Sequence, residues 1–139
     1  MPDVQPSDPA RILIVEDNAD FLAIVKYLLS NAGYAVLVAR DGQEGLAMAQ
    51  KERPDLVLTD LMLAKLNGYE LCTMLKQDVR YKRIPIVLFS ATKVEAKDEQ
   101  LAVQCGADAY LLKSMPAKDL LERIQAILRV AHGIRPIAT

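Results

Sequence analysis

Five polar side chains stand at the ends of short apolar runs in this chain, and together they could support phosphoryl transfer. They are Glu16, Asp17, Asp60, Ser90 and Lys113. Three carboxylates held close together would offer the oxygen ligands that Mg²⁺ prefers. Asp60 could then attack phosphorus in line and form an acyl phosphate, while the metal and the lysine ammonium stabilise charge on the phosphoryl oxygens. The serine hydroxyl could donate a hydrogen bond to the attached group.

Each of these residues also has an ordinary explanation when it is taken alone. Asp17 and Ser90 are of the types that favour turns and helix N-caps. An isolated Lys113 would be a solvated surface lysine. The functional interpretation therefore depends on whether the fold brings all of them to one edge.

The elements that must position these side chains are five apolar runs that alternate with helical patterns. We predict strands at residues 11–15, 35–39, 56–59, 86–90 and 109–112. Most are continuous apolar runs, as in strands buried on both faces of a parallel sheet. Strict alternation with short connections predicts an α/β fold, a doubly wound (βα)5 sheet in the flavodoxin-like order 2-1-3-4-5. In that order the first and third strands are neighbours, which places Glu16 and Asp17 beside Asp60.

Apolar residues at helical spacing define the helices between these strands. The first predicted helix has a face formed by Phe21, Val25, Leu28 and Leu29, and the fifth has one formed by Leu120, Ile124, Ile127, Leu128 and Ala131. Asp41 with Glu44 has the form of a capping box that opens the second helix. The fourth helix, at about residues 93–104, is the least amphipathic, and its candidate buried positions are Val94, Leu101, Ala102 and Cys105.

Length and composition fit one ordinary globular domain of 139 residues, with 52% apolar and 25% charged residues. No apolar stretch approaches the ~18 residues of a membrane span, and the N-terminus lacks a signal-peptide layout, so we expect a cytoplasmic protein. A net charge of −1 gives no electrostatic reason for direct nucleic-acid binding. The single His132, with Cys72 and Cys105 outside metal-ligand spacing, argues against a zinc site or a Ser-His-Asp hydrolase. We expect both cysteines to be buried or half-buried thiols.

Five ordered motifs make the chain similar to the receiver domain of two-component response regulators, the CheY-like family. They are ILIVEDN (12–18), PDLVLTDLML (54–63), NGYEL (67–71), PIVLFSA (85–91) and GADAYLLK (106–113). The resemblance covers about residues 10–131. We therefore expect a receiver domain at 11–131, after a flexible N-terminal arm at 1–10 that is rich in proline and before a C-terminal tail or truncated linker at 132–139.

The resemblance implies a role for each residue of the acidic group and for the lysine. Asp60 would be the phosphoacceptor. Asp17, Asp60 and the main-chain carbonyl of Met62 would bind Mg²⁺ directly, and Glu16 would act through a metal-bound water. Lys113 would contact the phosphoryl group.

A second set of implied roles concerns the conformational switch. Ser90 would be the switch hydroxyl, and Tyr110 would be the switch aromatic, whose ring turns inward when Ser90 moves toward the phosphoryl group. The plain alternative for Tyr110 is an ordinary strand aromatic. Met62 and Thr92 would flank the site and influence the lifetime of the phosphoryl group.

The sequence departs from the family pattern at two positions. Ala64 stands where the family usually has proline, although Asn67 and Gly68 still supply turn chemistry. Lys113 is followed by Ser114 instead of the proline that the family usually places after a cis bond. A cis bond before a non-proline residue costs ~3 kcal/mol, so this loop either holds that strain or differs from the family's usual shape.

The function that the resemblance implies is a phosphorylation-controlled switch, which is not an enzyme beyond catalysing its own phosphorylation and dephosphorylation. A sensor histidine kinase would donate the phosphoryl group. An output protein, or a second copy in a phosphorylation-dependent homodimer, would read the face formed by the fourth helix, fifth strand and fifth helix. The alternatives are a relay to a histidine phosphotransfer protein and a receiver fragment of a larger regulator or hybrid kinase.

Three other functions fit the residues less well. A phosphorylation-independent binding module predicts damage to the acidic group, yet every required side chain is present. Flavodoxin-like cofactor binding lacks a hydroxyl- and glycine-rich loop after the first strand. A phosphatase with an aspartyl intermediate would want a second carboxylate two residues after Asp60, where Met62 stands.

Overall fold

The computed structural model describes residues 9–91 and 96–132, and these form one parallel sheet of five strands with five helices. The strands are β1 (Arg11–Val15), β2 (Ala35–Ala39), β3 (Leu56–Asp60), β4 (Ile86–Ser90) and β5 (Ala109–Leu112). The helices are α1 (Ala19–Asn31), α2 (Gly42–Glu52), α3 (Gly68–Gln77), α4 (Ala96–Cys105) and α5 (Ala117–Ala131). The sheet has the order β2-β1-β3-β4-β5, so the predicted doubly wound fold and strand order are confirmed. β3 runs one residue further than predicted and includes Asp60.

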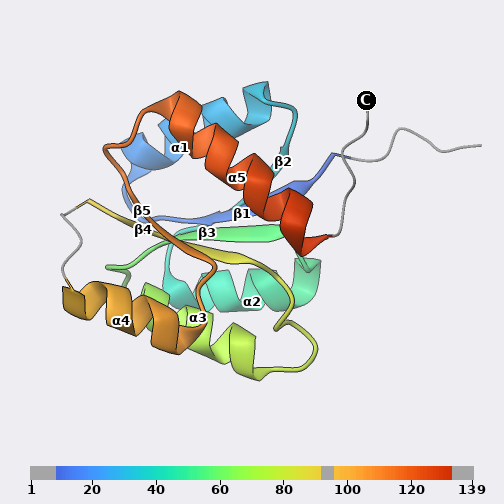
Figure 1. Cartoon of the computed structure of the whole chain (residues 1–139). Helices are drawn as coiled ribbons and strands as arrows, with labels where there is room; N and C mark the ends of the chain where they lie inside the picture. Colours follow the sequence, from blue (N-terminus) through green and yellow to red (C-terminus); the bar gives the residue numbers. More distant parts are fainter. Residues whose placement is uncertain (1–8, 92–95, 133–139) are drawn as a thin grey trace, which may run out of the picture.

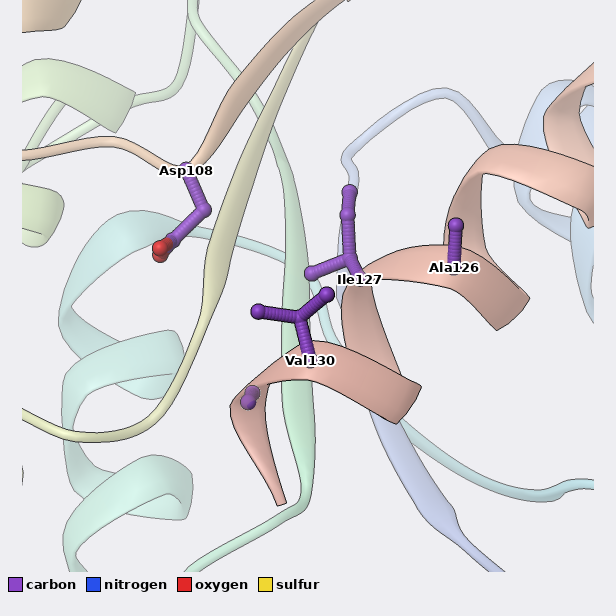
Figure 2. A pocket seen from close by; sticks show the side chains of 5 residues that line it. Asp108, Ala126, Ile127 and Val130 are labelled. Carbon is purple, nitrogen blue, oxygen red and sulfur yellow. The ribbon is translucent and has the colours of Figure 1, made fainter. Parts of the chain in front are cut away.

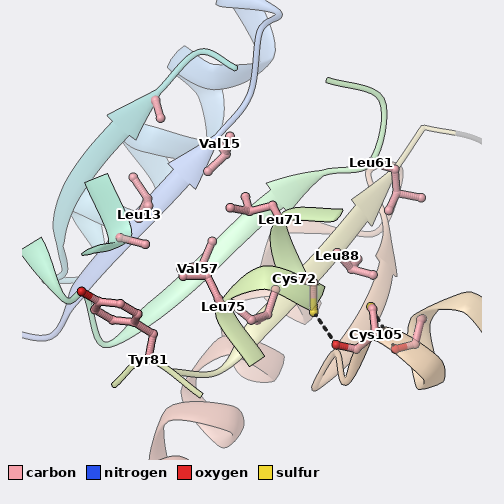
Figure 3. Packing of buried hydrophobic residues seen from close by; sticks show 14 residues of the cluster. Leu13, Val15, Val57, Leu61, Leu71, Cys72, Leu75, Tyr81, Leu88 and Cys105 are labelled. Atoms are coloured by element: carbon pink, nitrogen blue, oxygen red, sulfur yellow. Dashed lines mark hydrogen bonds between the residues drawn. The ribbon is translucent and has the colours of Figure 1, made fainter. Parts of the chain in front are cut away.

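Helices cover both faces of the sheet (Figure 1). α1 and α5 lie on one face, and α2, α3 and α4 lie on the other. Successive strand residues point to opposite faces, so Leu13 and Val57 pack toward α2 and α3 while Ile12 and Leu58 pack toward α1 and α5. Figure 3 shows the first of these two clusters. Burial on both faces explains why the strands are continuous apolar runs in the sequence.

Capping side chains fix where the helices begin. Asp41 accepts a hydrogen bond from the Glu44 backbone N–H at 2.8 Å, as predicted. The reciprocal bond of a capping box is missing, because the Glu44 carboxylate accepts from the Arg40 N–H instead, at 2.7 Å. A complete capping box occurs at α3, where Asn67 and Glu70 each accept from the backbone of the other. This box follows Asp60 by a few residues and therefore helps to fix the loop beside the site.

The helix faces match the predictions in part. Val25, Leu29, Ile124 and Leu128 are buried, whereas Ala131 is exposed. In α4 the predicted burial of Ala102 and Cys105 is confirmed, but Leu101 is 43% exposed. The described part of the chain leaves out residues 1–8, 92–95 and 133–139. Most of the expected N-terminal arm, most of the expected tail and Val94 therefore lie outside it.

Both cysteines are buried, as predicted. The Cys72 thiol donates a hydrogen bond to the Cys105 carbonyl oxygen at 3.3 Å (Figure 3). Burial, and then the contact with Cys105, raises the pKa of the Cys72 thiol well above its ordinary value. Within residues 9–91 and 96–132, none of the helices combines the length and apolar character that a bilayer span requires.

Candidate functional site

Three carboxylates meet at the carboxyl edge of the sheet because β1 and β3 are neighbours in register. Val15 pairs with Thr59, so Glu16 and Asp17 follow directly beside Asp60. One carboxylate oxygen from each of the three lies within 4.8 Å of the others. Glu16 is 2% exposed and Asp60 is 7% exposed, while Asp17 is open to solvent. The structure therefore brings together the acidic group that the sequence predicted.

Lys113 reaches this group from the end of β5. Its backbone N–H donates to the Ser90 carbonyl at 2.7 Å, which fixes the point where the side chain leaves the sheet. The ammonium lies 2.6 Å from Glu16 Oε1 and 3.5 Å from Asp60 Oδ2. Only 14% of the lysine side chain is exposed, so these charges interact in a partly desolvated environment. Lys113 is thus the counter-charge of the acidic group in this structure.

Backbone contacts hold the carboxylates in place. Asp60 Oδ1 accepts from the Leu61 N–H at 2.8 Å, and Glu16 Oε2 accepts from the Asn18 N–H at 3.0 Å. The start of α3 packs directly on this edge, because a Cβ atom on Gly68 would lie 2.4 Å from the Asp60 carbonyl oxygen. The Gly68 N–H also donates to the Leu61 carbonyl at 3.0 Å. Only glycine allows the helix to approach the acidic edge this closely.

Arg40 and Phe21 are neighbours of the site that the sequence analysis did not assign to it. The Arg40 guanidinium donates to the Asp17 carbonyl at 3.1 Å and ties the end of β2 to the acidic loop. Arg40 also follows an apolar strand, so the rule that found the other site residues could have found it. The Phe21 ring lies 4.6 Å from the Lys113 ammonium. No signal in the sequence distinguishes this ring from an ordinary apolar helix residue.

The predicted switch residues lie on β4, which neighbours the strand of Asp60, and on β5, the next strand of the sheet. Ser90 ends β4 and is 6% exposed, and Tyr110 in β5 is half-buried against the core on the α3 and α4 side. The Tyr69 hydroxyl of α3 donates to the Asp98 carbonyl oxygen of α4 at 3.4 Å. Burial, and then a hydrogen bond with Tyr110, raises the pKa of Tyr69 well above its ordinary value. Tyr110 is therefore linked through Tyr69 to α4.

The loops around the site depart from the family pattern at Ala64 and at Ser114, the two positions noted in the sequence. All peptide bonds in the described residues are trans, including the one after Lys113, so this loop differs from the family's usual shape. Near Ala64 the chain turns through Lys65, whose φ is +71°, and the Ala64 carbonyl accepts from the Gly42 N–H. The Met62 side chain is 81% exposed, and its carbonyl remains a predicted metal ligand. Thr92 lies outside the described residues.

The donor set fits a hard divalent cation. Carboxylate oxygens are the protein ligands that Mg²⁺ accepts, and it retains several waters that need an open side. Asp17 supplies that side because it faces solvent, whereas Glu16 and Asp60 are buried. Asp17 and Asp60 would hold the ion, with Glu16 close enough to act through a water.

An apolar hollow of about 260 Å³ lies at another part of the molecule (Figure 2). Side chains of α5, including Ile127 and Val130, line it together with Asp108. Asp108 precedes β5, at the strand end opposite to Lys113, and its carboxylate accepts from the Ile86 N–H and from Lys76. The hollow is thus remote from the acidic group, and its one carboxylate is already engaged in holding strands and helix together.

Comparison with known proteins gives the family. The response regulator receiver domain matches residues 12–125 of the chain. PhoP, the alkaline phosphatase synthesis transcriptional regulatory protein of Bacillus subtilis, is 39% identical over 126 residues, which are 91% of this chain and 51% of PhoP. The chain therefore belongs to the response regulator receiver domain family and is a signalling domain of two-component systems. It spans about half the length of the curated relatives that it matches.

Solved structures agree with this assignment. A CheY-like receiver domain protein of Methanospirillum hungatei JF-1 superposes with a TM-score of 0.83 at 30% identity, covering 90% of this chain and 98% of that one. The receiver domain of a sensor histidine kinase of Pseudomonas aeruginosa PAO1 has a TM-score of 0.77 at 28% identity, covering 91% and 99%. That structure has a magnesium ion coordinated in its active-site cleft.

Proposed function

We propose that Asp60 accepts a phosphoryl group from the phosphohistidine of a sensor histidine kinase, in a reaction that needs Mg²⁺. The observation that carries this proposal is the position of Asp60. It is a buried carboxylate that shares its site with Glu16 and Asp17 and lies 3.5 Å from the Lys113 ammonium. A nucleophilic carboxylate needs this arrangement, because a phosphoryl donor and an aspartate otherwise repel each other.

The transfer is an in-line displacement at phosphorus. An Asp60 carboxylate oxygen forms the new bond to phosphorus while the bond to the donor imidazole nitrogen breaks, and that nitrogen recovers its electron pair. Mg²⁺, when bound, neutralises charge on the phosphoryl oxygens. The Lys113 ammonium leaves Glu16 and contacts one of those oxygens, and the Ser90 hydroxyl donates to another. Asp17 would hold the metal directly, and Glu16 would act through a metal-bound water.

The phosphorylated domain would act through protein contacts on the face formed by α4, β5 and α5. Large apolar side chains are exposed on these helices, with Val103 at 78% in α4 and Val130 at 83% in α5. Tyr110 lies in β5 within this face, and β5 pairs with β4, the strand that ends at Ser90. An output protein or a second phosphorylated copy would bind there. The half-length match to curated relatives also supports a role as the receiver part of a longer regulator.

Labelling with a small phosphoryl donor tests the proposed acceptor. Incubation of the whole chain with acetyl phosphate and Mg²⁺ should add the mass of one phosphoryl group, and chelation of Mg²⁺ should prevent it. Asp60→Asn should abolish the labelling. Asp20→Asn is the matched control, because Asp20 is an exposed carboxylate in the first turn of α1 and is not part of the acidic group. Equal labelling of the Asp60→Asn protein would refute the proposal.

A transfer experiment separates the switch from the relay. Phosphorylated protein is mixed with candidate histidine phosphotransfer proteins, and the label is followed. Rapid movement of the label to a histidine would favour the relay. Retention of the label, with a phosphorylation-dependent complex or dimer, is the result that the switch predicts.

A further inference from the structure

The Lys113 ammonium contacts an aromatic ring as well as two carboxylates. Its nitrogen lies 4.6 Å from the centroid of the Phe21 ring, within the ~6 Å over which a cation is attracted to a ring face. Phe21 is half-buried in the first turn of α1. The ammonium therefore lies between this ring and the acidic group, and partial burial strengthens both attractions.

The position of the Phe21 ring is fixed from two sides. Its backbone N–H donates to the Asn18 side chain at 2.8 Å, which anchors the first turn of the helix. Its ring packs on Phe89 with centroids 5.3 Å apart and planes tilted by 59°. Phe89 is 2% exposed and pairs in register with Asp60 across the sheet. The ring is thus held against the strand that neighbours the acceptor.

We propose that Phe21 is a positioning residue, whose ring holds the Lys113 ammonium at the acceptor while its hydrogen bonds change partners. This inference rests on the proposed phosphorylation of Asp60. The ammonium bonds Glu16 at 2.6 Å in the unphosphorylated protein and must turn to the phosphoryl oxygens as they arrive. The ammonium has three N–H donors, so it can keep its contact with the ring while another donor turns from Glu16 to a phosphoryl oxygen. It also limits the many rotamers of a lysine side chain to those near Asp60.

The chemistry of the ring makes a specific prediction for substitutions. Leucine has apolar volume but no negative ring face, so Phe21→Leu keeps the packing in part and loses the attraction for the cation. Tyrosine and tryptophan keep an aromatic face, so Phe21→Tyr and Phe21→Trp should preserve it. A residue with a purely structural role would instead rank these variants by their fit to the core.

The first measurement is the rate constant for phosphorylation of the whole chain by acetyl phosphate at fixed Mg²⁺. Phe21→Leu should lower it about 5-fold, and Phe21→Tyr should stay within about 2-fold of the wild type. Ile24→Ala, on the next turn of the same helix and 56% exposed at that position, is the control that should leave the rate unchanged. Wild-type rates for Phe21→Leu, or an equal loss in Phe21→Tyr, would overturn the proposal.

A double-mutant cycle in unfolding gives a second readout that needs no phosphorylation. Phe21→Leu, Lys113→Met and the double variant are compared with the wild type. If the ring acts through the ammonium, the effect of Phe21→Leu on the unfolding equilibrium constant should be about 5-fold smaller in the Lys113→Met background. Additive effects would contradict the inference. Failure of the proposed function has a different signature, because the wild-type chain would then take up no label at Asp60.

Discussion

At the scale of single residues, the site is defined by an excess of negative charge. Three carboxylates face one ammonium, and the oxygens of Glu16, Asp17 and Asp60 lie within 4.8 Å of one another. Lys113 forms ion pairs with the two buried carboxylates, Glu16 and Asp60, and so reduces this repulsion. Among the ion pairs of the described residues, none joins Lys113 to the exposed Asp17. The site therefore gains from a cation and is under electrostatic stress without one.

Asp17→Asn should stabilise the protein when divalent cations are absent. Removing one of three clustered charges relieves about 1 kcal/mol of repulsion at an exposed position. The same variant should lose the stabilisation by Mg²⁺, which for one site amounts to about 2.7 kcal/mol at a hundred times the Kd. Urea unfolding with chelator and with Mg²⁺ measures both effects. A variant that is less stable in chelator and still responds fully to Mg²⁺ would contradict this account of the site.

Lys113→Met should destabilise the protein through Glu16. Glu16 is 2% exposed and loses its 2.6 Å ion pair, and an unpaired buried charge costs about 3 kcal/mol. Adding Glu16→Gln to the same protein removes that charge and should restore part of the loss. The free energy of unfolding of the two variants checks the argument. If Glu16→Gln does not restore the free energy of unfolding, Lys113 does not stabilise the protein through its ion pair with Glu16.

At the scale of elements, the site depends on how closely α3 approaches the end of β3. Gly68 opens that helix, and its backbone lies against Asp60 and Leu61. The capping box of Asn67 and Glu70 fixes the same turn. The helix therefore supports the loop that follows Asp60, the proposed acceptor.

Gly68→Ala should lower the free energy of unfolding by about 2 to 3 kcal/mol, because its Cβ would lie 2.4 Å from the Asp60 carbonyl oxygen and backbone must move. It should also slow phosphorylation, since the displaced backbone carries Asp60. Gly33→Ala is the control. A Cβ atom there would meet no other atom within 4 Å, but the φ of +98° strains any residue other than glycine. It should cost about 1 to 2 kcal/mol and leave the labelling rate intact. Equal labelling rates in both variants would show that α3 does not support the site.

The elements also show what the sequence could and could not predict. All five strands and their order follow from apolar runs that are buried on both faces, because such burial leaves a strong pattern. Surface helices leave a weaker apolar pattern in the sequence. Leu101 was therefore predicted to be buried, but it is 43% exposed. The predicted capping box at Asp41 is incomplete, because the Glu44 carboxylate accepts from the Arg40 N–H and not from the Asp41 N–H. Such competition is local geometry that residue types do not reveal.

The site was predictable to the extent that it lies at strand ends. The carboxylates and Lys113 were found because parallel strands deliver their carboxyl ends to one edge. Phe21 was predicted only as part of an apolar helix face, because its contact with Lys113 joins residues that lie far apart in the sequence. The trans bond after Lys113 was likewise left open by the sequence and is visible only in the structure.

At the scale of the whole molecule, the acidic group lies at one edge of the sheet, and the proposed function needs one face to transmit a change there. Ser90 ends β4, and Lys113 directly follows β5, the strand at the edge of the sheet. Tyr110 and Tyr69 connect this corner to α4 through the core side of the sheet. The hydrogen bonds of Tyr69 therefore connect β5 to α4 on the side where we expect a change at Asp60 to be transmitted.

Phosphorylation should change backbone protection unevenly across the fold. We expect hydrogen exchange to change in α4 and β5, while β1 and β3 in the fully buried centre stay protected. Mass-resolved exchange of the acetyl phosphate-treated protein, with Asp60→Asn treated identically as the reference, measures this. Changes spread evenly over all elements, or confined to α2, would contradict transmission through the α4 and β5 corner.

The most direct test of the central claim is to find the residue that carries the phosphoryl group. Reduction of the phosphorylated protein with borohydride converts an aspartyl phosphate to homoserine, and peptide mass spectrometry locates it. The proposed function predicts that homoserine forms at position 60, and that it forms only when Mg²⁺ was present during labelling. Conversion at Asp17 or at Glu16, or a stable phosphate on a hydroxyl residue with Asp60 unmodified, would contradict the account.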